Sequence, residues 1–561
     1  MHETIFFAAP DQPDVAGLSS LEKAERDRRR GSAATQRPLR LMKNSSTRYD
    51  LIRYPSYTHP QTHPDRLAVI GSLFGLEPAA ANRCRVLELG CGNGANLIPM
   101  AWSLPRSEFV GIDLAAEPVA DGNKMLHGLG LTNIRLAAGS VTEVNADWGS
   151  FDYIIAHGLY SWVPPQVREH MLSICQTNLT PRGIAFISYN AMPGGHLRNM
   201  LRDMMLFHVR GFEAAEERIR QSLAFVRFLA DAQDTEDDYR RWMKAESRRI
   251  LEHDAGHLYH DELGELNEPL YFTQFMEQAA RHGLQYLGEA DYFEMSDHIF
   301  KDSVRATLEQ LGSNRILREQ YLDFLKCRRF RQTLLCRGDA PLSPGPLAKS
   351  VERLFISSAA AISVDPLAER TAAHFFFESP KGAKIETDFA LGQSALKVLQ
   401  EIWPQPLPFE ELLQQATARL RPTSPSEADP STGRDRLGEF LLQLYGAGIV
   451  AFRSEPSPFV LQAGDRPATS PVARWQAQRG EIVTSMFHVT VKVEDEIGRQ
   501  LLTWLDGKHD RSALVDKLWL LLKSKHAVSA TANDEPAARR KIESDLEKNL
   551  LKLGRLGLLM T

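Results

Sequence analysis

Apolar and polar residues alternate along the chain with two different periods. From Tyr49 to about Asn190, short apolar runs, typical of buried strands, alternate with longer stretches of helical period. This alternation predicts an α/β fold in which parallel strands form a doubly wound, Rossmann-like sheet. The five expected strands are Val86–Leu89, Phe109–Ile112, Ile134–Leu136, Tyr153–Ala156 and Ile184–Ser188.

The rest of the chain has mostly helical periodicity. From Arg198 to Arg337 we expect helices and no strands, and from Gly338 to Lys384 a looser linker. A strand at Phe487–Val493 among short helices predicts a winged-helix-like α+β end of the chain. The helices expected there are Ala390–Ile402, Phe409–Leu420, Ile497–Leu505, Ser512–Leu522 and Ala537–Leu556, with a flexible loop at Arg421–Gly433.

These patterns divide the chain into five expected segments. A length of 561 residues is too great for one hydrophobic core, so several domains are required. We predict a weakly structured extension over 1–46, a Rossmann-like core over 47–197, a helical middle domain over 198–337, a linker over 338–384 and a winged-helix-like domain over 385–561.

Composition narrows the classes of function. The formal net charge is −5, which gives no global attraction to nucleic acid or to acidic membranes. No apolar run approaches the roughly 18 residues of a membrane helix, and the N-terminus does not resemble a secretory signal. The five scattered cysteines favour a reducing compartment over disulfides or structural zinc. We therefore expect a cytoplasmic protein without membrane insertion or a metal.

The strongest motif follows the first expected strand, where Gly90, Gly92 and Gly94 lead into a helix beginning near Asn96. Glycines allow a tight turn and close approach of a ligand, and a helix N-terminus offers N–H groups to a carboxylate. The same run also fits a dinucleotide pattern. Glu88, two residues before the first glycine, favours a ligand with a cationic amine and sulfonium. We therefore predict S-adenosylmethionine (SAM) as the cofactor.

Two further strand ends complete the predicted cofactor site. Asp113 ends the second strand about 20 residues after the glycine turn, where a carboxylate binds ribose hydroxyls. Ser140 follows the third strand, where many methyltransferases have an acidic residue for the adenine amino group; a hydroxyl accepts more weakly. The adjacent Leu114 and Val141 are included in the predicted site.

Several motifs together resemble a specific family, the bacterial methyltransferases with a regulatory domain, which include the rickettsial-type protein lysine methyltransferases. The resemblance implies methyl transfer to lysines of a protein substrate, in characterised members a large surface protein, and a three-part build ending in a winged-helix-like domain. A homodimer is compatible with it. The motifs are Thr62–Leu67, Phe151–Pro164, Tyr189–Asn190, Pro193–His196, Leu201–Met205, Asn267–Phe272 and His282–Leu284.

Candidate acceptor-side residues follow the fourth and fifth strands. His157, Tyr160 and Trp162 follow the fourth strand and Asn190 ends the fifth, the strand ends where this fold class binds ligands. The aromatic rings are candidates for holding a lysine ammonium, or for packing the loop. His157 is either a base or a hydrogen-bond partner of the cofactor or backbone, and Asn190 is a candidate to orient the amine. The resemblance adds Tyr57, His63 and Asp65 as residues that close the site.

Two further motifs could indicate functions other than methyl transfer to a protein, and two other functions are compatible with the cofactor motif. His253 and His257 resemble a metalloprotease pair, but Asp254 and Gly256 make a poor match. The basic segment Lys326–Arg331 favours a solvated helix face or a patch for an acidic protein over a nucleic-acid site. The alternatives are a small-molecule methyltransferase and a SAM-sensing regulator with a DNA-binding winged helix. Balanced charge from Glu386 onward makes nucleic acid the weaker choice.

Overall fold

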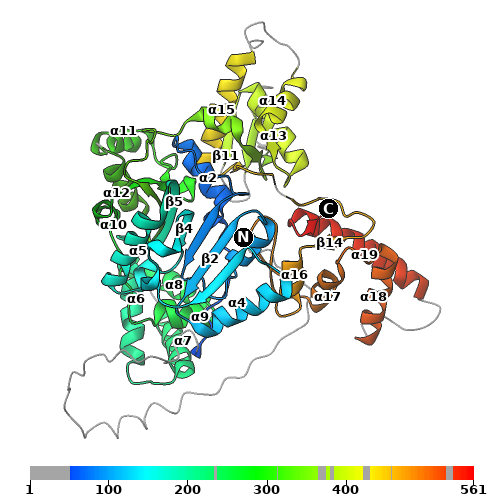
Figure 1. Ribbon diagram of the computed structural model, residues 1–561, viewed down its shortest axis with the longest axis horizontal. Helices are drawn as coiled ribbons and strands as arrows, with labels where there is room; N and C mark the ends of the chain where they lie inside the picture. Colours follow the sequence, from blue (N-terminus) through cyan, green and yellow to red (C-terminus); the bar gives the residue numbers. More distant parts are fainter. Residues whose placement is uncertain are drawn as a thin grey trace.

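The structure, a computed structural model, describes residues 51–560 except 233–236, 313, 364–374, 379–383, 421–429, 457 and 526–534. The predicted extension over 1–46 and most of the predicted loop Arg421–Gly433 lie outside these residues. One seven-stranded sheet occupies the centre of the molecule, with helices packed around it (Figure 1).

The sheet has the strand order β3-β2-β1-β4-β5-β7-β6. The first five strands are parallel, and each overlaps a predicted strand, so the predicted doubly wound sheet is confirmed. Because the chain runs outward from β1 to β3 and then returns to β4, the strand order reverses between β1 and β4, where such folds bind ligands. The strands are β1 (Arg85–Leu89), β2 (Glu108–Asp113), β3 (Ile134–Ala138), β4 (Phe151–Ala156) and β5 (Leu179–Asn190).

The expectation of no strands between Arg198 and Arg337 is wrong. β6 (Leu284–Glu289) and β7 (Phe330–Arg337) complete the sheet, with β7 antiparallel to both β5 and β6. The apolar pattern misses β7 because Arg331 and Thr333 are buried polar residues. The helices of this region are α6 (Gly194–Val209), α7 (Ala215–Asp231), α8 (Asp238–Leu251), α9 (Ala255–His257), η5 (Leu258–Glu262), α10 (Phe272–Arg281), η6 (Tyr292–Met295), α11 (Asp302–Leu311) and α12 (Arg315–Lys326).

The two faces of the sheet bury two different helix layers. Val86 and Tyr153 pack with α2 (Pro64–Leu73), α3 (Leu97–Ser103) and α4 (Ala116–Leu129). Their neighbours Leu87 and Ile154 point to the opposite face and pack with α5 (Pro165–Asn178) and α10. This alternation is the period of two that a strand buried on both faces requires.

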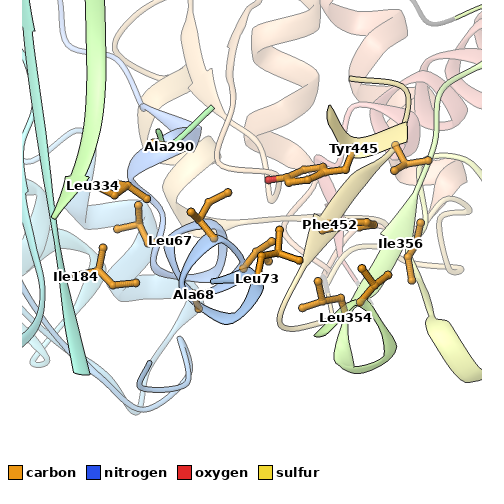
Figure 2. Close-up of a cluster of buried hydrophobic side chains, with 14 of the residues drawn as sticks. Leu67, Ala68, Leu73, Ile184, Ala290, Leu334, Leu354, Ile356, Tyr445 and Phe452 are labelled. Atoms are coloured by element: carbon orange, nitrogen blue, oxygen red, sulfur yellow. The ribbon is translucent and has the colours of Figure 1, made fainter. Parts of the chain in front are cut away.

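A second helical unit packs against α2 and η6, beside the sheet. Leu67 and Leu73 of α2 lie between Ile184 of the sheet and Leu354 and Phe452 of this unit (Figure 2). η7 and β8 fall inside the expected linker over 338–384 and contribute to this core. The unit contains η7 (Ala348–Arg353), β8 (Phe355–Ser357), α13 (Ala390–Ile402), β12 (Leu407–Pro408), α14 (Phe409–Ala418), α15 (Pro430–Gly446) and β13 (Ala451–Arg453), and β9 (Ala361–Ser363), β10 (Phe375–Glu378) and β11 (Lys384–Thr387) form a small sheet beside it in the chain.

The last part of the chain has a hydrophobic core of its own. It lies beside α4, with α16 against α3 and α4 (Figure 1). The predicted helices are present, although residues 385–561 form two cores where we expected one domain; the domain boundaries stay predictions. The elements are β14 (Ala468–Thr469), α16 (Pro471–Ala477), β15 (Ile482–Thr484), β16 (Thr490–Lys492), α17 (Glu496–Trp504), α18 (Arg511–Ser524), α19 (Glu535–Arg555) and β17 (Leu559–Met560).

Candidate active site

The glycine loop lies between β1 and α3, on the β1 side of the strand-order reversal. Gly90, Gly92 and Gly94 all have positive φ, at 79°, 54° and 74°, which disfavours other residues. A Cβ added to Gly92 would meet nothing within 4 Å, whereas one at Gly94 would lie 2.8 Å from Leu136. The loop is therefore open at Gly92 for a ligand and packed against the protein at Gly94.

Glu88 is buried directly beneath this loop, with 4% of its surface exposed. Its Oε1 accepts a hydrogen bond of 2.8 Å from Asn96 Nδ2, and its Oε2 has no hydrogen-bond partner. Burial raises its pKa to about 7; the Asn96 hydrogen bond opposes the rise, and the charge of Asp113 adds to it. A buried carboxylate oxygen without a partner is costly, so this position suits a cationic donor such as the amine of SAM.

Asp113 ends β2 beside the glycine loop. Its Oδ2 accepts from the Gly92 N–H and its Oδ1 from the Ala115 N–H, both at 2.8 Å. A carboxylate oxygen can accept more than one hydrogen bond, so ribose hydroxyls are compatible with these contacts. Leu114, the next residue, is 67% exposed at the same strand end, where the adenine ring of a bound cofactor would cover it.

Ser140 begins a short turn after β3, and its hydroxyl is already engaged. It accepts from the Thr142 N–H at 3.2 Å and lies 2.7 Å from the Thr142 hydroxyl. Glu143, which sequence reasoning missed, receives the Ser140 N–H at 3.1 Å. This capping box spans the short η2 helix, Val141–Glu143, and brings an acidic side chain to the strand end where an acidic residue is expected for the adenine amino group. Glu143 is therefore a second candidate for the adenine amino group.

Asn96 lies behind Glu88 and does not face the open side of the loop. Its Oδ1 accepts from the His59 N–H at 3.0 Å and faces His488 Nε2 at 2.8 Å, while its Nδ2 donates to Glu88 and to Thr62. All its hydrogen-bonding positions are used, so its side chain orients Glu88. His59 and His488 had no sequence signal, and Thr62 was known only as part of a family motif, because the three residues meet Asn96 only in the folded chain.

His157 follows β4, across the reversal point from the glycine loop. Its ring stacks on His59 with 3.6 Å between centroids. Burial, together with the charge of His59, holds its pKa well below the usual value, and burial lowers the pKa of His59 to about 4. Both rings are neutral at pH 7. His157 is therefore deprotonated but too weak a base to draw a proton readily from a lysine ammonium.

The structure places Tyr160, a predicted acceptor-side residue, in the hydrophobic core. Tyr160 is 0% exposed, and its hydroxyl donates to Gln278 Oε1 at 2.6 Å. It packs edge-to-face on Phe275 of α10 with centroids 5.3 Å apart. The turn Tyr160–Trp162 is a 3-10 helix with about three residues per turn, so Tyr160 and Trp162 point in different directions.

Trp162 and Asn190 are brought together by Arg198 of α6. The Arg198 guanidinium lies 5.4 Å from the Trp162 ring centroid, and its Nη1 donates to Asn190 Oδ1 at 3.1 Å. Glu262 pairs with the same guanidinium at 2.8 Å, and Asn190 Nδ2 donates to Asn267 at 2.7 Å. Trp162 stays half-buried, with a cation already at its ring.

The three residues expected to close the site have separate positions. Tyr57 stacks on His257, with centroids 5.8 Å apart. His63 caps α2 by accepting from the Asp65 N–H, and its ring lies 5.2 Å from that of His488. Asp65 is buried and pairs with Arg453 at 3.1 Å, away from the glycine loop. Asp65 also accepts from the Ser454 and Glu455 N–H groups and so anchors the chain after β13; its part in closing the site stays a prediction.

The His253–His257 motif and the basic segment Lys326–Arg331 have ordinary partners in the fold. His257 forms a 2.7 Å pair with Asp254. Within the described residues, no group of three potential ligands can hold a metal, and no helix has both the length and the apolar character of a membrane span. The expectation of a solvated or docking face at Lys326–Arg331 is wrong at Arg331, which is 1% exposed and paired with carboxylates.

Family models identify the class to which this site belongs. A methyltransferase domain model matches residues 86–183, which contain the glycine loop, Glu88 and Asp113. A predicted methyltransferase regulatory domain matches 254–337, and the PKMT C-terminal winged helix domain matches 465–558. The chain is a SAM-dependent methyltransferase with a Rossmann-like core and a C-terminal winged-helix domain.

Comparisons that cover most of the chain show the family to which it belongs. An uncharacterized protein of Rickettsia prowazekii (strain Madrid E) is 32% identical over 486 residues, covering 84% of this chain and 85% of that protein. PKMT2 from Rickettsia typhi is 26% identical with a TM-score of 0.79, covering 91% of this chain and 100% of that one; it was also solved in complex with AdoHcy. The chain belongs to this family of bacterial methyltransferases with a regulatory domain.

Proposed function

We propose that the enzyme transfers methyl groups from SAM to lysine side chains of a protein. The observation that carries this proposal is the similarity to PKMT2 over 91% of the chain, which includes the region matched by the PKMT winged helix domain. A small acceptor would not need the two further cores that surround the methyltransferase sheet. These cores offer surface on which a protein substrate can dock.

We propose that the cofactor lies over the glycine loop, between the ends of β1, β2 and β3. Glu88 Oε2 would accept a hydrogen bond from the methionine amine, and Asp113 would accept hydrogen bonds from the ribose hydroxyls. Gly92 would let the ligand approach the backbone. Leu114 and Val141 would flank the adenine, with Ser140 or Glu143 at its amino group. When bound, SAM supplies an electrophilic methyl group on a sulfonium.

We propose that the acceptor amine approaches from the β4 side, past His157. The stacked His59 and His157 rings are neutral at pH 7, so they do not repel a lysine ammonium. Phe330, at the start of β7, adds an aromatic edge 6.2 Å from His157. With Tyr160 in the core and Trp162 near Arg198, these three rings are the better candidates for a lysine channel.

The chemistry of an amine acceptor explains why no strong base is needed. A lysine has an unperturbed pKa near 10.4, so it must lose a proton before its lone pair can attack. Desolvation among neutral rings and the nearby sulfonium charge both lower that pKa. Positioning the two reacting centres then supplies much of the rate. Activity is expected to rise from about pH 7 toward 9 as the neutral amine becomes more common.

Transfer of isotopic label tests the acceptor class. The purified chain is incubated with methyl-labelled SAM and an extract of its native cells, and the modified residues are identified by peptide mass spectrometry. Label on lysine Nε is expected, with exported surface proteins the first candidates because of the family resemblance. Glu88→Gln is the control, and at SAM concentrations below the parent's saturation it should transfer much less label. Label confined to carboxylates, RNA or a metabolite would refute the lysine acceptor.

A further inference from the structure

One residue of the winged-helix domain reaches the cofactor site of the core. His488 lies in the turn between β15 and β16, is 5% exposed, and faces Asn96 at 2.8 Å. Its φ is 59°, a left-handed conformation uncommon outside glycine. Contacts with the surrounding structure must therefore stabilise this backbone conformation at His488.

The hydrogen bonds around Asn96 determine the orientation of its amide. The His59 N–H can only donate, so the atom it contacts at 3.0 Å is the oxygen Oδ1. Nδ2 therefore faces Glu88. Because Oδ1 can only accept, His488 must donate to it from Nε2, which requires a proton on Nε2; in the neutral ring this is the Nε2–H tautomer. Burial favours this neutral state, as do the charges of His63, His59 and Arg453, all of which lower the pKa of His488.

The hairpin that carries His488 is attached to the segment before α2. Thr490 accepts from the Thr58 N–H at 3.1 Å, and the two hydroxyls are 3.0 Å apart. Thr58 precedes His59, whose N–H holds the Asn96 amide and whose ring stacks on His157. The hairpin thus contacts a stretch of chain that touches both Asn96 and His157.

A separate contact docks the same domain on the core. The Trp475 ring of α16 lies against Gly128 of α4, so closely that a Cβ at Gly128 would be 2.1 Å from it. α16 also contacts α3, the helix that begins after Asn96. The position of His488 therefore depends on how the whole winged-helix domain sits on the core.

We infer that His488 is a positioning residue of the cofactor site, which holds the Asn96 amide so that Glu88 keeps its orientation toward SAM. This inference rests on the proposed place of SAM at Glu88 and does not depend on lysine as the acceptor. It makes cofactor affinity depend on the docked winged-helix domain. By linkage, cofactor binding must stabilise that docking by the same factor.

The closing experiment measures SAM affinity by calorimetry on full-length variants. His488→Leu keeps side-chain bulk and removes the donor, and it should weaken SAM binding about tenfold. His488→Gln restores an N–H donor near the position of Nε2 and should bind within about threefold of the parent. Val489→Ala, on the exposed side of the same turn, is the matched control and should bind like the parent.

A pH series adds a result that simple destabilisation would not produce. SAM affinity should rise as pH increases through the pKa of Glu88, about 7, because the carboxylate becomes charged. Asp113 and Cys91 are the other titratable groups that interact with Glu88. Loosening Asn96 removes a contact that lowers this pKa, so the midpoint should move to higher pH in His488→Leu and not in His488→Gln.

Three outcomes decide between the inference and the site assignment. Equal SAM affinity in His488→Leu and the parent, with Glu88→Gln weakened, would overturn only the role of His488. Equal loss of SAM affinity in His488→Leu and His488→Gln would also overturn that role, because packing alone would then explain the loss. Parent-like binding by Glu88→Gln would overturn the proposed cofactor site itself, and the inference with it.

A measurement on the parent protein covers the case in which His488→Leu does not fold. Amide hydrogen exchange is followed with and without AdoHcy. Exchange in the hairpin Ile482–Lys492 should slow on binding, together with that of the glycine loop. Protection of the glycine loop without any change in the hairpin would overturn the inference.

Discussion

Two buried polar clusters lie at the sheet, and they differ in how their charges are paired. The Arg331 cluster consists of Arg331 on β7 with Glu289, Glu319 and Asp323. The Asn96 cluster consists of Asn96 with Glu88, Thr62, His59 and His488. In the first, a cation contacts three carboxylates. In the second, the only carboxylate has a neutral partner on one oxygen and none on the other.

The difference separates a structural cluster from a ligand site. Arg331 attaches β7 to β6 and α12 through ion pairs that need nothing from outside the chain. Glu88 keeps a buried oxygen unpaired, which costs folding free energy until a donor arrives. Removing charge should therefore have opposite effects in the two places, and the predictions below use that contrast.

The largest effect is expected at Arg331. Arg331→Met removes a cation that contacts Glu289, Glu319 and Asp323. Arg328 still pairs with Glu319 and Asp323, but Glu289 keeps only neutral hydrogen-bond donors, and breaking such a buried pair costs about 3–5 kcal/mol. Urea unfolding measures the loss. Arg182→Met is the control, because its pair with Glu77 is exposed and contributes less than about 1 kcal/mol. Similar losses in the two variants would show that the Arg331 cluster does not stabilise the sheet.

Glu88→Gln should lose ligand affinity and keep its stability. Losing a hydrogen bond to a charged group costs about 1.5–3 kcal/mol, which is about ten- to a hundredfold in SAM affinity. Unfolding free energy at pH 8 should be equal to or above that of the parent, because a buried charge is removed. Calorimetry and urea unfolding give both numbers. Glu117→Gln, at an exposed position of α4, is the control. A free energy of unfolding for Glu88→Gln below that of the control would contradict the contrast between the two clusters.

Acid should destabilise the protein through the histidines around the Asn96 cluster. Burial lowers the pKa of His59 and of His63 to about 4, so stability is present above about pH 6.5 and is lost as pH falls toward 4. One such histidine contributes about 2 kcal/mol between pH 7 and 5. Glu88 acts in the opposite direction, because its pKa is raised; its contribution is lost as pH rises from 4.5 to about 7.

His63→Asn isolates this contribution to the acid sensitivity. Asn retains an acceptor for the Asp65 N–H at the start of α2 but cannot be protonated in this range. The difference in unfolding free energy between pH 7 and pH 5 should shrink by about 2 kcal/mol relative to the parent. An unchanged difference would mean that His63 does not carry a lowered pKa.

The smallest effect is expected at Tyr160. Tyr160→Phe removes the hydrogen bond to Gln278 and should cost about 1 kcal/mol in unfolding free energy. The rate of methyl transfer should be unchanged, because the ring lies in the core beneath α10. Loss of activity without loss of stability would return Tyr160 to the acceptor site.

The cofactor half of the active site could be predicted from local sequence, but the acceptor half could not. The five parallel strands, the glycine loop, Glu88 and Asp113 were predictable because strand, turn and carboxylate lie within a few residues of each other or at a known spacing. The position of Tyr160 could not be predicted because its direction depends on a short 3-10 turn. His488 and β7 were missed because their partners are distant in sequence, and Arg331 looked like a surface charge.

The most direct test of the account is a crystal structure of this protein with AdoHcy. The account predicts that the amine of AdoHcy lies within hydrogen-bond distance of Glu88 Oε2, with the ribose at Asp113 and Asn96 still between Glu88 and His488. An AdoHcy amine held elsewhere, with Glu88 Oε2 still lacking a partner, would contradict it.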